Sequence, residues 1–117
     1  MLSNYFYGEA KKYFDKVSDL LGDRKEEVLA AVSAAEEDER ACLQFCYGTL
    51  PLSDIGEYDV SVIRGFVRHA LFVREKMEWC RNLPEEIFVH YVLYPRINSE
   101  KLVDCRRMFY SPPVFPN

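Results

Sequence analysis

The stretch EYDVSVIRGFVRHALFVREKMEWC, residues 57–80, is the longest uninterrupted helical pattern in the chain. Its apolar residues recur at steps of three and four, so they share one face of a helix. That face is formed by Ile63, Phe66, Val67, Ala70, Val73, Met77 and Cys80. Val62, Phe72 and Trp79 widen the apolar surface on one flank, which is typical of a helix that contacts several neighbours. The pattern predicts a long central helix over about residues 58–80, with the rest of the chain packed around it.

Two further helices are predicted upstream of this stretch. Ser3 or Asn4 is a suitable N-cap for the first, and Gly22 is suited to end it in a left-handed conformation. Asp23 and Glu26 have the spacing of a capping box, which predicts the start of the second helix. Its alanines would allow close contact with another helix, and they are Ala30, Ala31, Ala34 and Ala35.

Four consecutive acidic residues, 36–39, precede a third helix that is predicted over about residues 39–47 with Gly48 as its end. We interpret the acidic run as a solvated helix start, because negative charge is favourable at a helix N-terminus. Downstream of the long helix, Pro84 predicts the start of a short helix, and Pro95 predicts its end.

The predicted fold class is therefore all-α. A last helix is expected from Asn98 or Ser99 to about Tyr110, and strand-like alternation is nowhere sustained. The sequence predicts a compact bundle of five or six helices over residues 1–110. Residues 111–117 contain three prolines and are predicted to form a linker or tail.

Composition narrows the class of protein. A chain of 117 residues with 49% hydrophobic content is one domain with enough apolar surface to fold. The net charge of -4 argues against a nucleic-acid binder, which would carry a basic patch. No apolar run approaches the roughly 20 residues that a membrane span needs. The N-terminus lacks the pattern of a secretory signal, so the expected location is cytoplasmic, or extracellular if a signal was removed.

The four cysteines are predicted to be buried, reduced thiols. Cys42 and Cys46 are one helical turn apart, whereas Cys80 and Cys105 occur singly in apolar patterns. Their spacing relative to the two histidines is a poor match to a metal site, so no metal and no cofactor is predicted. His69 and Cys80 would lie about 16 Å apart on one helix, so they cannot form a Cys-His catalytic pair. An enzyme that uses Cys80 or Cys105 is therefore kept only as a third alternative.

Charged side chains collect around the predicted final helix. Arg96, Asn98, Glu100 and Arg107 are the candidate residues for a surface that contacts a following domain or another partner. The simpler interpretation is a set of exposed ion pairs that contribute little to stability.

Three stretches resemble the N-terminal helical region of bacterial transglutaminase-like proteins. They are LGDRKEEVLAAV (21–32), FCYGTLPLSD (45–54) and GFVRHALFVREKMEWCRNLPEEIFVHYVLYPRINSEKLVDCRRMFY (65–110). The specific part is LPEEIFVHYVLYPRINSE, residues 83–100. The matching positions are Trp79, Pro84, Phe88, Tyr91, Val92, Arg96, Asn98 and Glu100.

The resemblance implies a non-catalytic accessory domain. In that family the helical region precedes a papain-like core with a Cys-His-Asp triad, and no cysteine of this chain has the context of the nucleophile. The segment itself is then not an enzyme, although the parent protein would be a transglutaminase-like enzyme or protease. Its partner would be that catalytic domain or a polypeptide substrate. The alternative is an independent helical module that binds a peptide or a hydrophobic ligand in a groove.

Overall fold

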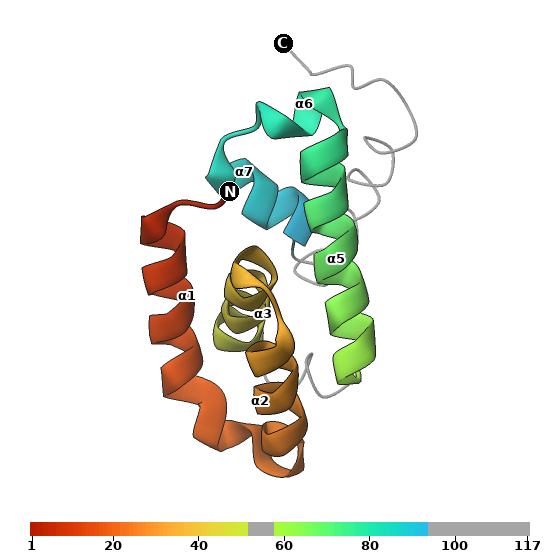
Figure 1. The fold of residues 1–117 in the computed structure, drawn as a ribbon. Helices are drawn as coiled ribbons and strands as arrows, with labels where there is room; N and C mark the ends of the chain where they lie inside the picture. The colour runs from red at the N-terminus through yellow and green to blue at the C-terminus, as the bar shows by residue number, and fades with distance from the viewer. Residues whose placement is uncertain (52–57, 94–117) are drawn as a thin grey trace. The chain divides into compact units, whose positions relative to one another are not determined.

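The computed structural model describes residues 1–51 and 58–93, and these ranges are helical without any strand (Figure 1). The all-α prediction is confirmed. The chain divides into two compact units, Met1–Arg68 and His69–Asn117. No helix in the described ranges is long and apolar enough to cross a membrane. The predicted last helix, the domain end at residue 110 and the tail over 111–117 lie outside the described residues.

Helix α1, Asn4–Val17, begins where the sequence predicts. The Ser3 Oγ accepts a hydrogen bond from the Phe6 N–H at 3.1 Å, which satisfies one of the free amides of the first turn. The helix ends before Gly22, because the tighter 3₁₀ helix η1, Ser18–Arg24, takes over its last turns. Gly22 still makes the turn with a positive φ of 61°.

Helix α2, Lys25–Ala34, buries Val28, Ala31 and Val32. The predicted capping box does not form. Arg24, in the N-cap position, already has helical dihedral angles, and no side chain caps the helix. The chain enters α2 directly from η1, so it lacks the extended N-cap residue that a capping box requires.

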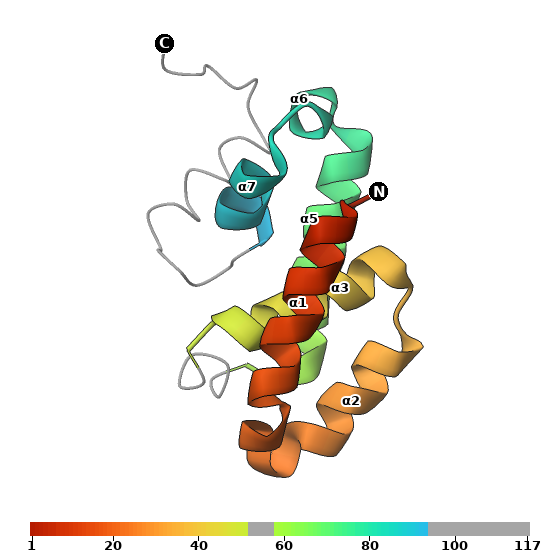
Figure 2. The same ribbon diagram turned by 90° about the vertical axis from the view of Figure 1, so that its left-hand side faces the viewer.

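Helix α3, Glu37–Thr49, lies beside α1 in both views (Figures 1 and 2). The rings of Phe6 and Phe45 are 4.9 Å apart between centroids. Gly48 was predicted to end this helix, but it lies within it. A Cβ at Gly48 would lie 2.5 Å from the Tyr13 Cβ and 2.7 Å from the Tyr13 carbonyl carbon. Gly48 is therefore a close-packing glycine that lets the α1 and α3 backbones approach each other.

Helix α5, Val60–Lys76, is shorter than the predicted helix over 58–80. Met77 has an extended conformation, with φ of -97° and ψ of 116°, and separates α5 from the short α6, Glu78–Arg81. No glycine or proline marks this break, so the apolar period continues across it in the sequence. Arg74 and Lys76 occupy the last turn of α5, where positive charge suits the negative end of the helix dipole.

The buried face of α5 agrees with the prediction at Ile63, Val67, Ala70 and Val73, and Val60 extends it. The prediction that Val62 and Phe72 add to the apolar contact surface of this helix is wrong. Val62 is 39% exposed and Phe72 is 54% exposed. These residues lie on the solvent side of the helix in the described structure.

Helix α7, Glu85–Phe88, follows Pro84, as the sequence predicts to within one residue. A π-helical turn, η2 (Val89–Leu93), continues it. Phe88, Val89 and Leu93 are buried, whereas Ile87, which was predicted to face inward, is 36% exposed. The Arg74 guanidinium lies 4.9 Å from the Phe88 ring centroid, a cation–π contact.

Candidate functional site

The partner surface predicted from the sequence consists of Arg96, Asn98, Glu100 and Arg107. All four lie outside the described residues, so this surface stays a prediction. The described part of the chain offers a different site, within the Met1–Arg68 unit.

An open pocket of about 450 Å³ lies between α2 and the first turns of α5. We call it the α2–α5 groove. Its lining consists of Glu27, Ala30, Ala31, Ala34, Val60, Ser61, Arg64, Gly65 and Arg68. The two helices run in the same direction along it (Figure 1). The α2 wall, Glu27 to Ala34, is about 12 Å long at 1.5 Å per residue, which is about two helical turns.

Small side chains form most of the groove. Ala30 and Ala34 are exposed, whereas Ala31 is buried. A Cβ built on Gly65 would meet no atom within 4 Å, so the opposite wall is also open. Of the four alanines expected to allow close helix contact, Ala31 and Ala35 are buried, whereas Ala30 and Ala34 are exposed and line the groove. Walls without long side chains permit the backbone of a bound chain to approach closely.

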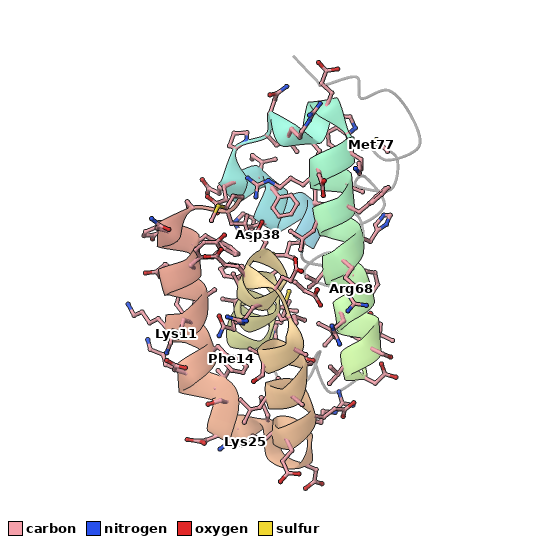
Figure 3. All side chains as sticks on the ribbon, viewed as in Figure 1. Lys11, Phe14, Lys25, Asp38, Arg68 and Met77 are labelled. Carbon is pink, nitrogen blue, oxygen red and sulfur yellow. The ribbon has the colours of Figure 1, made fainter. Side chains whose placement is uncertain are left out.

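A cluster of two arginines and one glutamate lies on the α5 side of the groove. Glu39, in the first turn of α3, accepts from Arg64 and Arg68 through a single oxygen, Oε1. The Arg64 Nε and Nη2 lie 3.1 and 3.0 Å from this oxygen, and the Arg68 Nε lies 3.3 Å from it. We call these three residues the arginine–glutamate cluster. Figure 3 labels Arg68 on α5.

The three side chains of the cluster differ in their exposure to solvent. The Glu39 side chain is 15% exposed, that of Arg64 is 25% exposed and that of Arg68 is 59% exposed. One carboxylate balances only one of two guanidinium charges. The uncompensated positive charge is therefore at the outer arginine, which also lines the groove.

The two ends of the groove carry opposite charge. Glu27 is in the first turn of α2, and Arg68 is the lining residue farthest along α5. The two helices run in the same direction, and Glu27 is near the start of α2 whereas Arg68 is about two turns into α5. The acidic residue is therefore towards one end of the groove and the outer arginine towards the other.

The acidic run forms the start of α3 as predicted, and Glu36 and Glu37 are exposed. Asp38 and Glu39 are less exposed and make contacts that the prediction of a solvated helix start did not include. Glu39 is bound to the two arginines, and Asp38 is bound to α1. The Asp38 Oδ1 accepts from the Leu2 N–H at 3.2 Å and from the Tyr7 hydroxyl. Burial and the Asp38 carboxylate raise the pKa of Tyr7. The partners come from distant parts of the chain, which is why the sequence pattern alone does not show them.

Near the Glu27 end, Tyr47 is fully buried on α3, and its hydroxyl has no hydrogen-bond partner among the described residues. Burial raises its pKa to about 12.

The Arg24 guanidinium donates to the Tyr58 carbonyl, which links η1 to the residues before α5. Asp59 then accepts from the Val62 N–H at 2.9 Å at the start of α5.

The prediction of buried, reduced thiols is confirmed for three of the four cysteines. Cys42, Cys46 and Cys80 are buried thiols. Burial raises the pKa of Cys46 to about 12 and that of Cys80 to about 11. Such thiols are poor nucleophiles at neutral pH, because the reactive species is the thiolate. Over the ranges 1–51 and 58–93, no three His, Cys, Asp or Glu side chains are grouped closely enough to hold a metal ion. Cys105 lies outside these ranges.

Sequence reasoning missed the groove. The arginines at positions 64 and 68 are one helical turn apart, and the alanine spacing in α2 is also visible in the sequence, but neither pattern shows that the two faces oppose each other. Comparisons of this chain with protein-family models, with curated proteins and with solved structures find no match.

Proposed function

We propose that this chain is a non-catalytic helical module that binds a segment of another polypeptide in the α2–α5 groove. The observation that carries the proposal is an open groove with small-residue walls and opposite charge at its two ends. A helix packed in a groove and an extended strand are both common forms of peptide recognition. A groove of about two helical turns accommodates about seven residues of a bound helix.

A polypeptide is favoured over a small apolar ligand by the shape and charge of the site. Pockets for small molecules enclose most of the ligand and are lined mainly by large apolar side chains. This groove is open and its apolar walls are alanines, whereas its charged residues, Glu27 and Arg68, lie towards opposite ends. A segment with a complementary pair of charges fits this arrangement.

The non-catalytic part of the proposal is supported by the thiols. The raised pKa values of Cys46 and Cys80 place both thiols in the protonated, unreactive form at neutral pH.

The proposal is tested by selecting binders from a displayed library of random 12-residue peptides on the immobilised full chain. Ala30→Trp fills the groove with a large side chain at an exposed position. Leu29→Trp is the matched control, because Leu29 is on the same helix, is 38% exposed and does not line the groove. Far-ultraviolet circular dichroism checks that both variants fold.

Selected peptides should bind the wild type and Leu29→Trp equally and lose at least about tenfold in affinity for Ala30→Trp, about 1.4 kcal/mol. Failure to enrich any peptide, or binding that persists when the groove is filled, would overturn the proposal.

A narrower version of the same function comes from the resemblance of residues 83–100 to transglutaminase-like proteins. In this version the module contacts a catalytic domain, or presents a polypeptide to it, through Arg96, Asn98, Glu100 and Arg107. Reading the gene beyond codon 117 tests it. A continuing frame with a cysteine, a histidine and an aspartate in transglutaminase order supports this version, and a stop codon removes the catalytic partner from the same chain.

A further inference from the structure

We infer that the arginine–glutamate cluster is a carboxylate-binding site, and that the polypeptide bound in the α2–α5 groove places an aspartate or glutamate side chain against Arg68. The inference rests on the proposed function and adds the chemistry by which the groove chooses its partner. It also fixes a direction, with the acidic residue of the partner at the Arg68 end and away from Glu27.

Arg68 has hydrogen-bond donors that its contact with Glu39 does not use. A guanidinium has five N–H donors, and the contact of Arg68 with Glu39 uses its Nε. Its terminal Nη groups have no acceptor among the described residues, and the side chain is 59% exposed. The terminal edge of an arginine matches a carboxylate in geometry and can donate two parallel hydrogen bonds to it.

Glu39 holds the two arginines in place. This carboxylate anchors both arginines through one oxygen, so Arg64 and Arg68 are held before any ligand arrives. An arginine that is already oriented loses less side-chain freedom on binding, which leaves more of the interaction as affinity. Arg64 is more buried and completes the anchor, whereas Arg68 faces the ligand.

The charges within the arginine–glutamate cluster do not balance. The cluster holds two positive charges and one negative charge, so it has an excess of one positive charge in a chain whose formal net charge is -4. Asp38, the neighbour of Glu39, is already occupied by Leu2 and Tyr7. A carboxylate from the bound polypeptide would therefore be attracted by the remaining positive charge of the cluster.

The test uses the ¹⁵N-labelled full chain and three small probes at constant ionic strength. N-acetyl-glutamate methylamide carries the side-chain carboxylate on a peptide-like backbone, and N-acetyl-glutamine methylamide is its uncharged match. Inorganic phosphate distinguishes a carboxylate site from a general anion site. The arginine Nε–H signals are followed by NMR. Arg68→Gln removes the donor, and Lys76→Gln is the matched control, because Lys76 is an exposed cation elsewhere on α5.

The glutamate probe should shift the Nε–H signals of Arg64 and Arg68 saturably, with half-saturation on the order of 10 to 100 mM, the weak affinity expected of one charge-assisted hydrogen-bonded pair. The glutamine probe should not shift them, Arg68→Gln should abolish the response, and Lys76→Gln should keep it. Equal responses to glutamate and glutamine, stronger binding of phosphate, or a response that survives Arg68→Gln would each overturn the inference.

This result is separable from the proposed function. Peptides that need an open groove but show no preference for an acidic residue, together with a silent glutamate probe, would overturn the carboxylate site and leave peptide binding standing. A saturable glutamate response, with no peptide whose binding depends on the groove, would overturn the proposed peptide binding. The cluster would then be a carboxylate site alone.

Discussion

The α1–α3 contact and the α2–α5 groove both depend on residues with little or no side chain, and they differ in what surrounds those residues. At Gly48, Tyr13 atoms occupy the space that a side chain would need, so α1 and α3 pack closely against each other. At Gly65 nothing lies within 4 Å of the missing Cβ, so the helices leave an open groove. The same residue type makes a closed contact in one place and a binding surface in the other.

The polar contacts follow the same division. Tyr7 and Leu2 both bind Asp38 and tie the start of α1 to the start of α3. On the groove side, Glu39 binds two arginines that remain partly exposed. Neighbouring acids in one helical turn therefore serve different purposes, one closing a contact and the other holding donors at an open surface.

The largest effect at neutral pH is expected from the closed contact. Gly48→Ala would place its new methyl group 2.5 Å from the Tyr13 Cβ, so α1 must shift. We expect the free energy of unfolding to fall by about 3 kcal/mol, measured by urea denaturation. Gly8→Ala on α1 meets no atom within 4 Å and should raise it by about 1 kcal/mol through helix propensity. An unchanged stability in Gly48→Ala would mean that α1 and α3 are not this close in solution.

A smaller loss is expected when the anchor of the groove is removed. Glu39→Gln leaves Arg64 and Arg68 without a carboxylate, and the free energy of unfolding should fall by about 2 kcal/mol. The control is Asp15→Asn, which breaks the exposed pair with Lys11 and should change stability by less than about 0.5 kcal/mol. Equal effects in the two variants would place the cluster among ordinary surface ion pairs.

Alkaline pH should weaken the buried side of α3. Unfolded thiols and phenols ionise near pH 9 and 10, whereas burial raises the pKa of Cys46 and Tyr47 to about 12. The folded chain then holds protons that the unfolded chain has lost. Stability is therefore full below about pH 9 and falls as the pH rises towards 12, by up to about 1.4 kcal/mol per pH unit for each group.

Tyr47→Phe removes one of these two groups, so its loss of stability between pH 10 and 12 should be shallower than that of the wild type. Thermal or urea unfolding at several pH values measures this slope. The same slope in wild type and Tyr47→Phe would contradict the burial of the hydroxyl.

The smallest expected difference separates two tyrosines at neutral pH. Tyr7→Phe removes a hydroxyl that binds Asp38 and should lower the free energy of unfolding by about 1.5 kcal/mol. Tyr47→Phe removes a buried hydroxyl without a partner among the described residues, so it should be neutral or slightly stabilising. The reverse order would show that the Tyr47 hydroxyl is bonded and that of Tyr7 is not.

The features that the sequence predicted correctly are local ones. The Ser3 cap, the restart at Pro84 and the buried face of α5 depend on residues within a few positions of one another. Buried thiols at Cys42 and Cys46 follow from the apolar period of α3.

The features that it missed depend on distant neighbours or on small differences in backbone preference. Gly48 is explained by Tyr13, and Glu39 by two arginines at least 25 residues away. The break at Met77 has no proline or glycine to announce it. The groove requires α2 and α5 to face each other, which no single helical pattern contains.

Gly48 also has a consequence for how many sequences this fold tolerates. In a saturation library, glycine should be strongly preferred at position 48, because every other amino acid has a Cβ that would collide with Tyr13. Positions 8 and 65 are also glycines, yet a Cβ there meets no atom within 4 Å, so they should accept many substitutions without loss of folding. The information that a glycine contributes to specifying this fold is therefore set by the atoms opposite it.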